Sequence, residues 1–168
     1  MIDVTPYEQC VCLKMNKTHE LCDDRLTFSE QGKQIKLGIR KGEEAKALVL
    51  DGCVFTDDLP KCDGMFLFKS RNRKFAILVE LKGAHDIPHA IEHLAYTQKL
   101  RHEYQQLIKR FHADGQGQLS ERAFIVSNGM LSKPVLERLE NKFAIRVNAL
   151  LHCEATSPIP DLRNYVMQ

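Results

Sequence analysis

One strand of this chain is predicted to be apolar on both of its faces and to end in charged residues. Residues 75–79 contain no polar side chain, and they lead directly into Glu80-Leu81-Lys82. Such a run is typical of the central strand of a sheet that is covered on both sides. Side chains two positions apart on a strand project to the same face, so we expect Glu80 and Lys82 to lie together while Leu81 packs on the other face.

A second apolar run precedes this strand and adds a carboxylate to the pattern. Residues 64–68 and 75–81 flank the polar turn 69–74, which favours a β-hairpin with Asp63 at the mouth of its first strand. The hairpin would place Asp63 beside Glu80 and Lys82. Burying charges next to a core costs free energy unless they pair or bind a metal. The pattern therefore predicts a binding or catalytic site, and its alternative is a salt bridge at a strand end.

The flanking segments predict the remaining layers of the fold. Short apolar runs indicate strands, and apolar residues at helical spacing indicate helices. The further strands are expected at residues 47–50, 123–126 and 145–151, and the helices at about 88–112 and from 132 onward. The order from residue 47 is β-β-β-α-β-α-β, so the fold class is α/β with a mixed central sheet flanked by helices. Residues 29–47 could hold one or two helical turns.

Length and composition limit the classes of protein to consider. The 168 residues suit one domain, which we divide into an N-terminal extension (1–42), a core (43–151) and a C-terminal tail (152–168). No apolar run approaches the roughly 20 residues of a membrane helix, and the N-terminus lacks the pattern of a signal peptide. We therefore expect an intracellular protein, cytoplasmic or, in a eukaryote, nuclear. The net charge of +2 predicts no global attraction to nucleic acid, only local patches.

The six cysteines are expected to be free thiols, because disulfides are rare in a reducing compartment. One compact Cys/His group could instead bind zinc, although it lacks the paired spacing of a common zinc finger; its members are Cys10, Cys12, His19 and Cys22. The others are predicted to be small core residues, namely Cys53, Cys62 and Cys153.

The segment Cys62-Asp63-Gly64, followed after the hairpin by Ile77-Leu78-Val79-Glu80-Leu81-Lys82-Gly83, resembles the PD-(D/E)XK nuclease superfamily. The similarity covers residues 43–151, and the helix expected from residue 88 stands where that family has the helix after its motif. Cys62 replaces the family's usual proline. The resemblance implies a restriction-endonuclease-like core and a metal-dependent nuclease that hydrolyses phosphodiester bonds, most often in DNA. RNA, and the choice among sequence, structure and strand ends, stay open.

The resemblance also assigns roles to individual residues. Asp63 and Glu80, with the backbone carbonyl of Leu81, would hold Mg²⁺ or Mn²⁺, and Lys82 would assist the attacking water. A further metal ligand is expected before the first core strand, and two adjacent residues are candidates, Glu43 and Glu44. Since one site makes one cut, cleavage of both strands would favour a homodimer. Protein partners in a larger complex are a second form of assembly to consider.

Contacts to nucleic acid are expected from two groups of side chains. The hairpin turn carries a cluster of cations, which could contact phosphates or simply be solvated: Lys69, Arg71, Arg73 and Lys74. The helix after the motif adds polar groups, with a histidine where the family often has glutamine: His89, His93 and Gln98. More cations follow on the same predicted helix, namely Lys99, Arg101, Lys109 and Arg110.

A competing motif overlaps this helix. His89-Ala90-Ile91-Glu92-His93 matches H-x-x-E-H, in which two histidines on one helix face bind zinc and the glutamate is the general base of a peptidase. A third ligand would have to come from a distant residue; the candidates are Glu137, Glu140 and Glu154. A non-catalytic module that binds nucleic acid or protein on the same fold is the other hypothesis, because fold alone does not decide activity.

Overall fold

The computed structural model describes residues 1–14 and 17–167, so residues 15–16 of the predicted extension and residue 168 of the predicted tail lie outside the described residues. A five-stranded mixed sheet with the strand order β4-β5-β6-β7-β8 forms the centre of the fold. Its strands are β4 (Glu44–Val49), β5 (Gly64–Ser70), β6 (Arg73–Lys82), β7 (Gln118–Ser127) and β8 (Ala149–His152). Strands β4, β5 and β6 pair antiparallel, whereas β6, β7 and β8 pair parallel. The predicted mixed sheet is confirmed.

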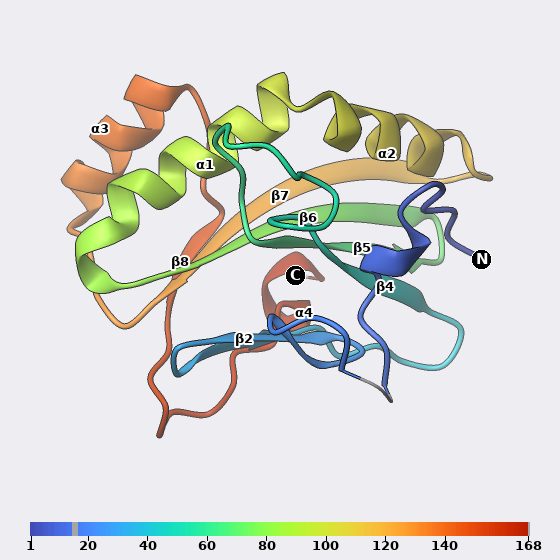
Figure 1. Cartoon of the computed structure of the whole chain (residues 1–168), viewed down its shortest axis with the longest axis horizontal. Helices are drawn as coiled ribbons and strands as arrows, with labels where there is room; N and C mark the ends of the chain where they lie inside the picture. The colour runs from blue at the N-terminus through green and yellow to red at the C-terminus, as the bar shows by residue number, and fades with distance from the viewer. Residues whose placement is uncertain (15–16, 168) are drawn as a thin grey trace.

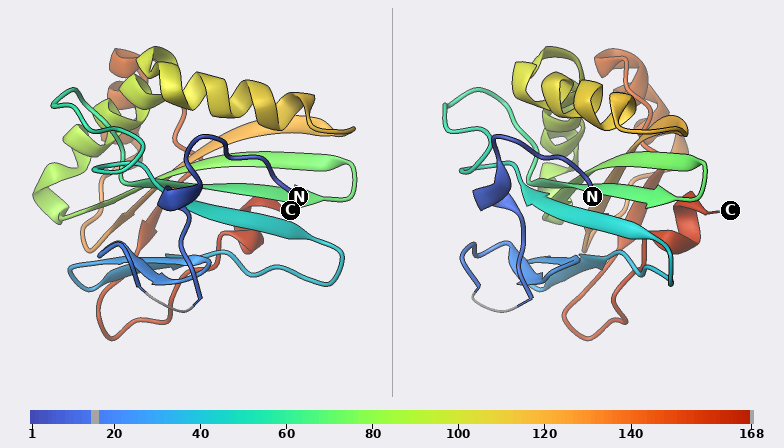
Figure 2. Two further views of the ribbon diagram at one scale, coloured as in Figure 1. Left: turned by 45° about the vertical axis from the view of Figure 1, so that its right-hand side comes forward. Right: turned by 90° about the vertical axis from the view of Figure 1, so that its right-hand side faces the viewer.

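Helices cover one face of this sheet, and a small second sheet covers the other (Figures 1 and 2). The helices above the sheet in Figure 1 are α1 (Ile87–Leu100), α2 (His102–Ala113) and α3 (Lys133–Phe143). The small sheet is β1 (Cys22–Asp24), β2 (Thr27–Glu30) and β3 (Lys33–Lys36), with the short helix α4 (Arg163–Val166) on the same side. Two 3₁₀ turns complete the elements, η1 (Glu8–Cys10) and η2 (Ala84–Asp86). Within the described residues, no helix is both long and apolar enough to cross a membrane.

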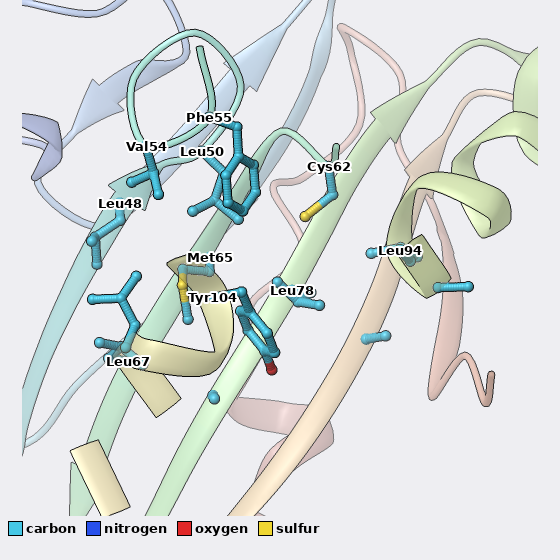
Figure 3. Packing of buried hydrophobic residues seen from close by; sticks show 14 of the residues in the cluster. Leu48, Leu50, Val54, Phe55, Cys62, Met65, Leu67, Leu78, Leu94 and Tyr104 are labelled. Atoms are coloured by element: carbon cyan, nitrogen blue, oxygen red, sulfur yellow. The ribbon is translucent and has the colours of Figure 1, made fainter. Parts of the chain in front are cut away.

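Strand β6 lies in the middle of the sheet because both of its faces are apolar. Ala76 and Leu78 pack into the cluster beneath the helices, where Leu78 lies near Met65 and Tyr104 (Figure 3). Ile77 and Val79 pack on the opposite face with the small sheet. Burial of an aliphatic side chain of this size stabilises a fold by about 1.5–3 kcal/mol. The predicted central strand is confirmed.

The hairpin that joins β5 to β6 is tighter than the polar turn in the sequence suggests. Ser70 pairs with Arg73, so the turn has two residues, and Arg71 adopts a positive φ of 52°. Gly64, at the other end of β5, has no room for a side chain, because a Cβ atom there would lie 2.7 Å from the ring of Phe28. The glycine after Asp63 therefore lets the small sheet approach the main sheet closely.

The long helix expected over residues 88–112 is broken at Arg101, whose φ and ψ of −86° and 110° are extended. The Arg101 side chain is 2% exposed; its guanidinium lies 4.1 Å from the ring centre of Phe55 and donates to Asp57 at 2.8 Å. These contacts with the loop after β4 hold the chain where the two helices meet. The expectation that Arg101 contacts nucleic acid is therefore wrong.

Both ends of the chain pack on the core. The helical turns considered for residues 29–47 are absent, since that stretch forms part of β2, β3 and most of β4. Phe28 and Ile35 are fully buried against the main sheet, and so is Leu162 near the C-terminus. Alternating burial along β3 gives it the period of a strand, which the glycines and charges of this region mask in the sequence.

Four of the six cysteines form disulfides, Cys10–Cys53 and Cys12–Cys22, so the prediction of free thiols is wrong for them. The zinc site considered at Cys10, Cys12, His19 and Cys22 fails for the same reason, because its three thiols are consumed. The fold brings the paired Cα atoms to 5.7 and 5.6 Å, the normal separation for a disulfide. Cysteine spacing alone does not reveal such pairings. Cys62 and Cys153 are buried free thiols, as expected.

Candidate functional site

Asp63 is held in place by the backbone on both sides of β5. Its carboxylate oxygen Oδ2 accepts a hydrogen bond of 2.8 Å from the N–H of Leu81 on β6. Its carbonyl oxygen accepts from the N–H groups of Leu50 and Asp51, which follow β4, at 2.9 and 3.3 Å. The residue is only 7% exposed. Asp63 is therefore fixed at the point where β4, β5 and β6 end or begin, as the hairpin pattern predicts.

Glu80 is the most unusual residue of this region, because it is fully buried and incompletely paired. Its oxygen Oε2 lies 3.3 Å from Nδ1 of His93 on α1 and 3.9 Å from Nζ of Lys82. Its other oxygen, Oε1, has no hydrogen-bond partner among the described residues. Leu81 packs with the opposite cluster, which confirms that Glu80 and Lys82 share the helix-facing side of β6. A buried carboxylate oxygen without a partner costs free energy unless a further ligand satisfies it.

The two carboxyl groups hold their protons more tightly than in water. Burial, with Glu80 beside it, raises the pKa of Asp63 well above its usual range. Burial also raises the pKa of Glu80 to about 8, although the ammonium of Lys82 opposes this shift. The pKa of His93 is lowered, by burial first and by Lys82 second, which favours a neutral imidazole. Two carboxyls that share an apolar site behave in this way when no cation balances their charge.

These residues fit a hard divalent cation. Asp63, Glu80 and the backbone carbonyl of Leu81 provide oxygen ligands, and the unpartnered Oε1 of Glu80 is such an oxygen. In the part of the chain that the structure describes, no group of three or more His, Cys, Asp or Glu side chains could hold a metal ion. Mg²⁺ suits such a sparse site, because it keeps several waters and needs only one or two carboxylates from a protein.

The two glutamates proposed as a further ligand lie at the other end of β4. Glu44 pairs with Lys69, whereas Val49 pairs with Gly64 next to Asp63, so roughly 17 Å of strand separates the two ends. Glu43 forms an ion pair with Arg163, and Glu44 accepts a hydrogen bond from the N–H of Ile2. The expectation that Glu43 or Glu44 is a metal ligand is wrong, because β4 runs antiparallel to β5 and carries them away.

The basic turn of the hairpin is remote from the carboxylates as well. Strand β6 has 10 residues, so roughly 30 Å separates its first residue, Arg73, from Lys82. Lys74 is 1% exposed, and its Nζ donates to the carbonyl of Phe111 at 2.9 Å near the end of α2. Lys74 is thus a structural residue, and its predicted contact with nucleic acid is wrong. The other cations of the turn, Lys69, Arg71 and Arg73, do not reach the carboxylates.

The polar residues of α1 divide into two groups. His93 contacts Glu80, and the ring of exposed His89 lies parallel to that of His93 with the centres 6.2 Å apart. Gln98 instead lines a separate hollow with Tyr104, away from Glu80. The zinc-peptidase motif at His89 and His93 lacks a third ligand, since the described residues offer no metal-binding group of three.

An acidic cleft beside Asp63 was not predicted from the sequence. It encloses about 200 Å³ between the small sheet and the ends of β4 and β5, and it is lined by His19, Glu20, Leu21, Glu30, Val49, Asp51 and Asp63. The charge of Glu30 contributes to the raised pKa of both Asp63 and Glu80. Val49, Asp51 and Asp63 belong to segments that the sequence predicts, whereas the remaining walls come from the N-terminal region, whose strands the pattern did not reveal.

Comparison of the chain with protein-family models, with curated proteins and with solved structures finds no match.

Proposed function

We propose that this protein is a metal-dependent nuclease of the PD-(D/E)XK type that hydrolyses phosphodiester bonds in DNA. The observation that carries the proposal is the fully buried Glu80, which has an unpartnered oxygen among the described residues and lies beside Asp63 and Lys82. A buried carboxylate with an unpartnered oxygen destabilises the fold. Its presence is therefore better explained by binding of a cation than by a structural role.

The arrangement of the elements supports the same proposal. An antiparallel hairpin carries Asp63 and Glu80, α1 and α2 cross above the sheet, and β7 returns parallel to β6. The restriction-endonuclease-like core of the PD-(D/E)XK nucleases, which the sequence resembles, has the same order of elements. The helix α1 packs over β6, which is how His93 reaches Glu80.

Each residue has a distinct task in the proposed reaction. Asp63, Glu80 and the carbonyl of Leu81 would hold Mg²⁺ or Mn²⁺, which supplies positive charge that polarises the phosphodiester and its attacking water. The N–H of Leu81 fixes the orientation of Asp63, and His93 fixes Glu80. Lys82, whose side chain is 28% exposed beside Glu80, can orient the attacking water or stabilise charge that develops on the phosphate.

Cleavage assays test the proposal directly. Plasmid, linear duplex and single-stranded DNA, together with RNA, would be incubated with the protein in Mg²⁺, Mn²⁺ or EDTA. We expect cutting of DNA with metal only, and Asp63→Asn should reduce it at least about 100-fold. A protein that cuts none of these substrates with either metal contradicts the nuclease. Salt-dependent binding of DNA without cutting would favour the non-catalytic binding module instead.

The basic turn provides a second prediction and a matched control. Because Arg71 and Arg73 lie at the far end of β6, Arg71→Ala and Arg73→Ala should leave the rate of cleavage within about twofold of wild type. Cleavage of a short duplex, too short to extend along the whole sheet, is the measurement. A large loss of rate on this short substrate would show that the turn contacts the DNA near the cut.

A further inference from the structure

The Cys10–Cys53 disulfide lies close to the acidic cleft. Cys53 follows Asp51 by two residues, and Asp51 lines the cleft with Asp63. His19, which also lines the cleft, has its Nε2 3.9 Å from the sulfur of Cys53. The Cys10–Cys53 bond therefore lies at the base of one wall of the candidate site.

The turn that contains Cys53 also holds Asp63. The N–H of Cys53 donates to the carbonyl of Leu50 at 3.2 Å, and the N–H of Leu50 donates to the carbonyl of Asp63 at 2.9 Å. Phe55 donates to the same carbonyl of Leu50 at 2.9 Å, so residues 50–55 close a compact turn. Displacement of this turn would act on the backbone of Asp63 through two hydrogen bonds.

The other half of the disulfide belongs to a segment on the outer edge of the sheet. Val11 forms a bridge with Leu48 of β4, and the N–H of Cys12 donates to the carbonyl of Ala47 at 2.8 Å. Cys10 precedes this bridge and is fully buried. The Cys10–Cys53 bond therefore ties the turn after β4 to a short strand-like segment that runs along β4.

The two disulfides differ in their access to solvent. Cys12 and Cys22 are 0% and 2% exposed, so neither sulfur is open to attack without local unfolding. Cys53 is only partly buried, so the Cys10–Cys53 bond lies nearer to solvent than the Cys12–Cys22 bond does. Exposed disulfides are more easily reduced than buried ones, and the labile ones are often regulatory.

We propose that the Cys10–Cys53 disulfide is a redox latch for the metal site, an inference that rests on the proposed nuclease function. In the oxidised state the latch fixes residues 50–55 and, through them, Asp63. In the reduced state the turn is released from the edge of β4, and the cation is bound more weakly.

The chemistry is thiol–disulfide exchange with a dithiol. One thiolate of the dithiol attacks the sulfur of Cys53 and breaks the disulfide, and Cys10 leaves as a thiolate that takes up a proton. The second thiol of the dithiol then displaces Cys53, which also takes up a proton. The dithiol leaves as its own intramolecular disulfide, so two electrons pass to the protein.

The test compares the folded oxidised protein with the same protein treated with dithiothreitol. Mass spectrometry after alkylation should show that Cys10–Cys53 is reduced first, while Cys12–Cys22 persists. We expect the dissociation constant for Mn²⁺, measured by titration calorimetry, to rise by at least about tenfold on this reduction. The double variant Cys10→Ser/Cys53→Ser should match the reduced protein. Cys153→Ser, which removes a buried free thiol outside both disulfides, should respond to dithiothreitol as wild type does.

Two results would overturn the latch. One is equal reduction of both disulfides under native conditions, and the other is an unchanged Mn²⁺ affinity after selective reduction. Amide hydrogen exchange gives a readout independent of metal, since reduction should increase exchange at residues 50–55 relative to β7. The protein could show faster exchange at residues 50–55 on reduction and yet neither bind Mn²⁺ nor cut DNA. In that case the nuclease proposal fails, but the disulfide does hold the turn in its oxidised state.

Discussion

Replacement of Glu80 by glutamine is expected to abolish metal-dependent cleavage and, in the absence of metal, to make the protein more stable above neutral pH. Glutamine has nearly the same shape as glutamate but carries no charge, so the packing beside His93 and Asp63 is kept. The change removes one of two carboxylates that would hold the cation. We expect cleavage to fall by at least about 100-fold.

The pH dependence follows from the raised pKa of Glu80, about 8 against an ordinary 4.5. The folded protein keeps a proton that the unfolded chain releases, so this group contributes its full stability below pH 4.5. That contribution is lost as the pH rises toward 8. Glu80→Gln lacks this loss. The free energy of unfolding of Glu80→Gln should therefore exceed that of wild type by an amount that grows between about pH 5 and 8 and reaches a few kcal/mol.

Urea unfolding at several pH values in EDTA measures this difference. Addition of Mg²⁺ should stabilise wild type at pH 8 and leave Glu80→Gln nearly unchanged, because ligand binding stabilises the folded state that holds it. Glu92→Gln is the matched control, since Glu92 lies on α1 next to His93 but makes no hydrogen bond to the site in the described structure. If the free energies of unfolding of wild type and Glu80→Gln change in parallel from pH 5 to 8, the result would falsify the raised pKa of the buried Glu80 carboxyl.

Lys82→Met is expected to remove cleavage while sparing the metal. The methionine keeps the apolar stem of the side chain but not the ammonium, which lies 3.9 Å from Oε2 of Glu80. Loss of a positive charge near the carboxylates does not weaken a bound cation, whereas loss of a group that orients water costs about 10²–10⁴ in rate. Single-turnover cleavage and Mn²⁺ titration separate the two effects.

Two further results sharpen this test. Lys82→Arg should recover part of the rate, because it restores a cation with a different geometry. Should Lys82→Met cut DNA at the wild-type rate, the lysine has no part in the reaction and only the metal ligands remain. A fall in Mn²⁺ affinity as large as the fall in rate would instead make Lys82 a structural partner of Glu80.

The sequence by itself determined the centre of the sheet and the three residues of the candidate site. Strand β6 had to be central because residues 75–79 within it are all apolar, and a hairpin of neighbouring runs brings Asp63 beside Glu80. These features depend on the two-residue period of a strand and on contacts between segments adjacent in the chain. Local pattern is enough to predict them.

The tertiary structure decided which other residues join the site. Glu43 or Glu44 was expected to bind the metal and the basic turn to contact nucleic acid, but the antiparallel register of β4, β5 and β6 places them at the opposite end of the sheet from Asp63. The same register brings the turn after β4, with Asp51 and Cys53, to Asp63. The disulfide of Cys53 with Cys10 spans 43 residues, and the acidic cleft draws on a small sheet with no clear sequence signal. Contacts between distant segments depend on the direction and register of every strand between them, which spacing along the chain does not encode.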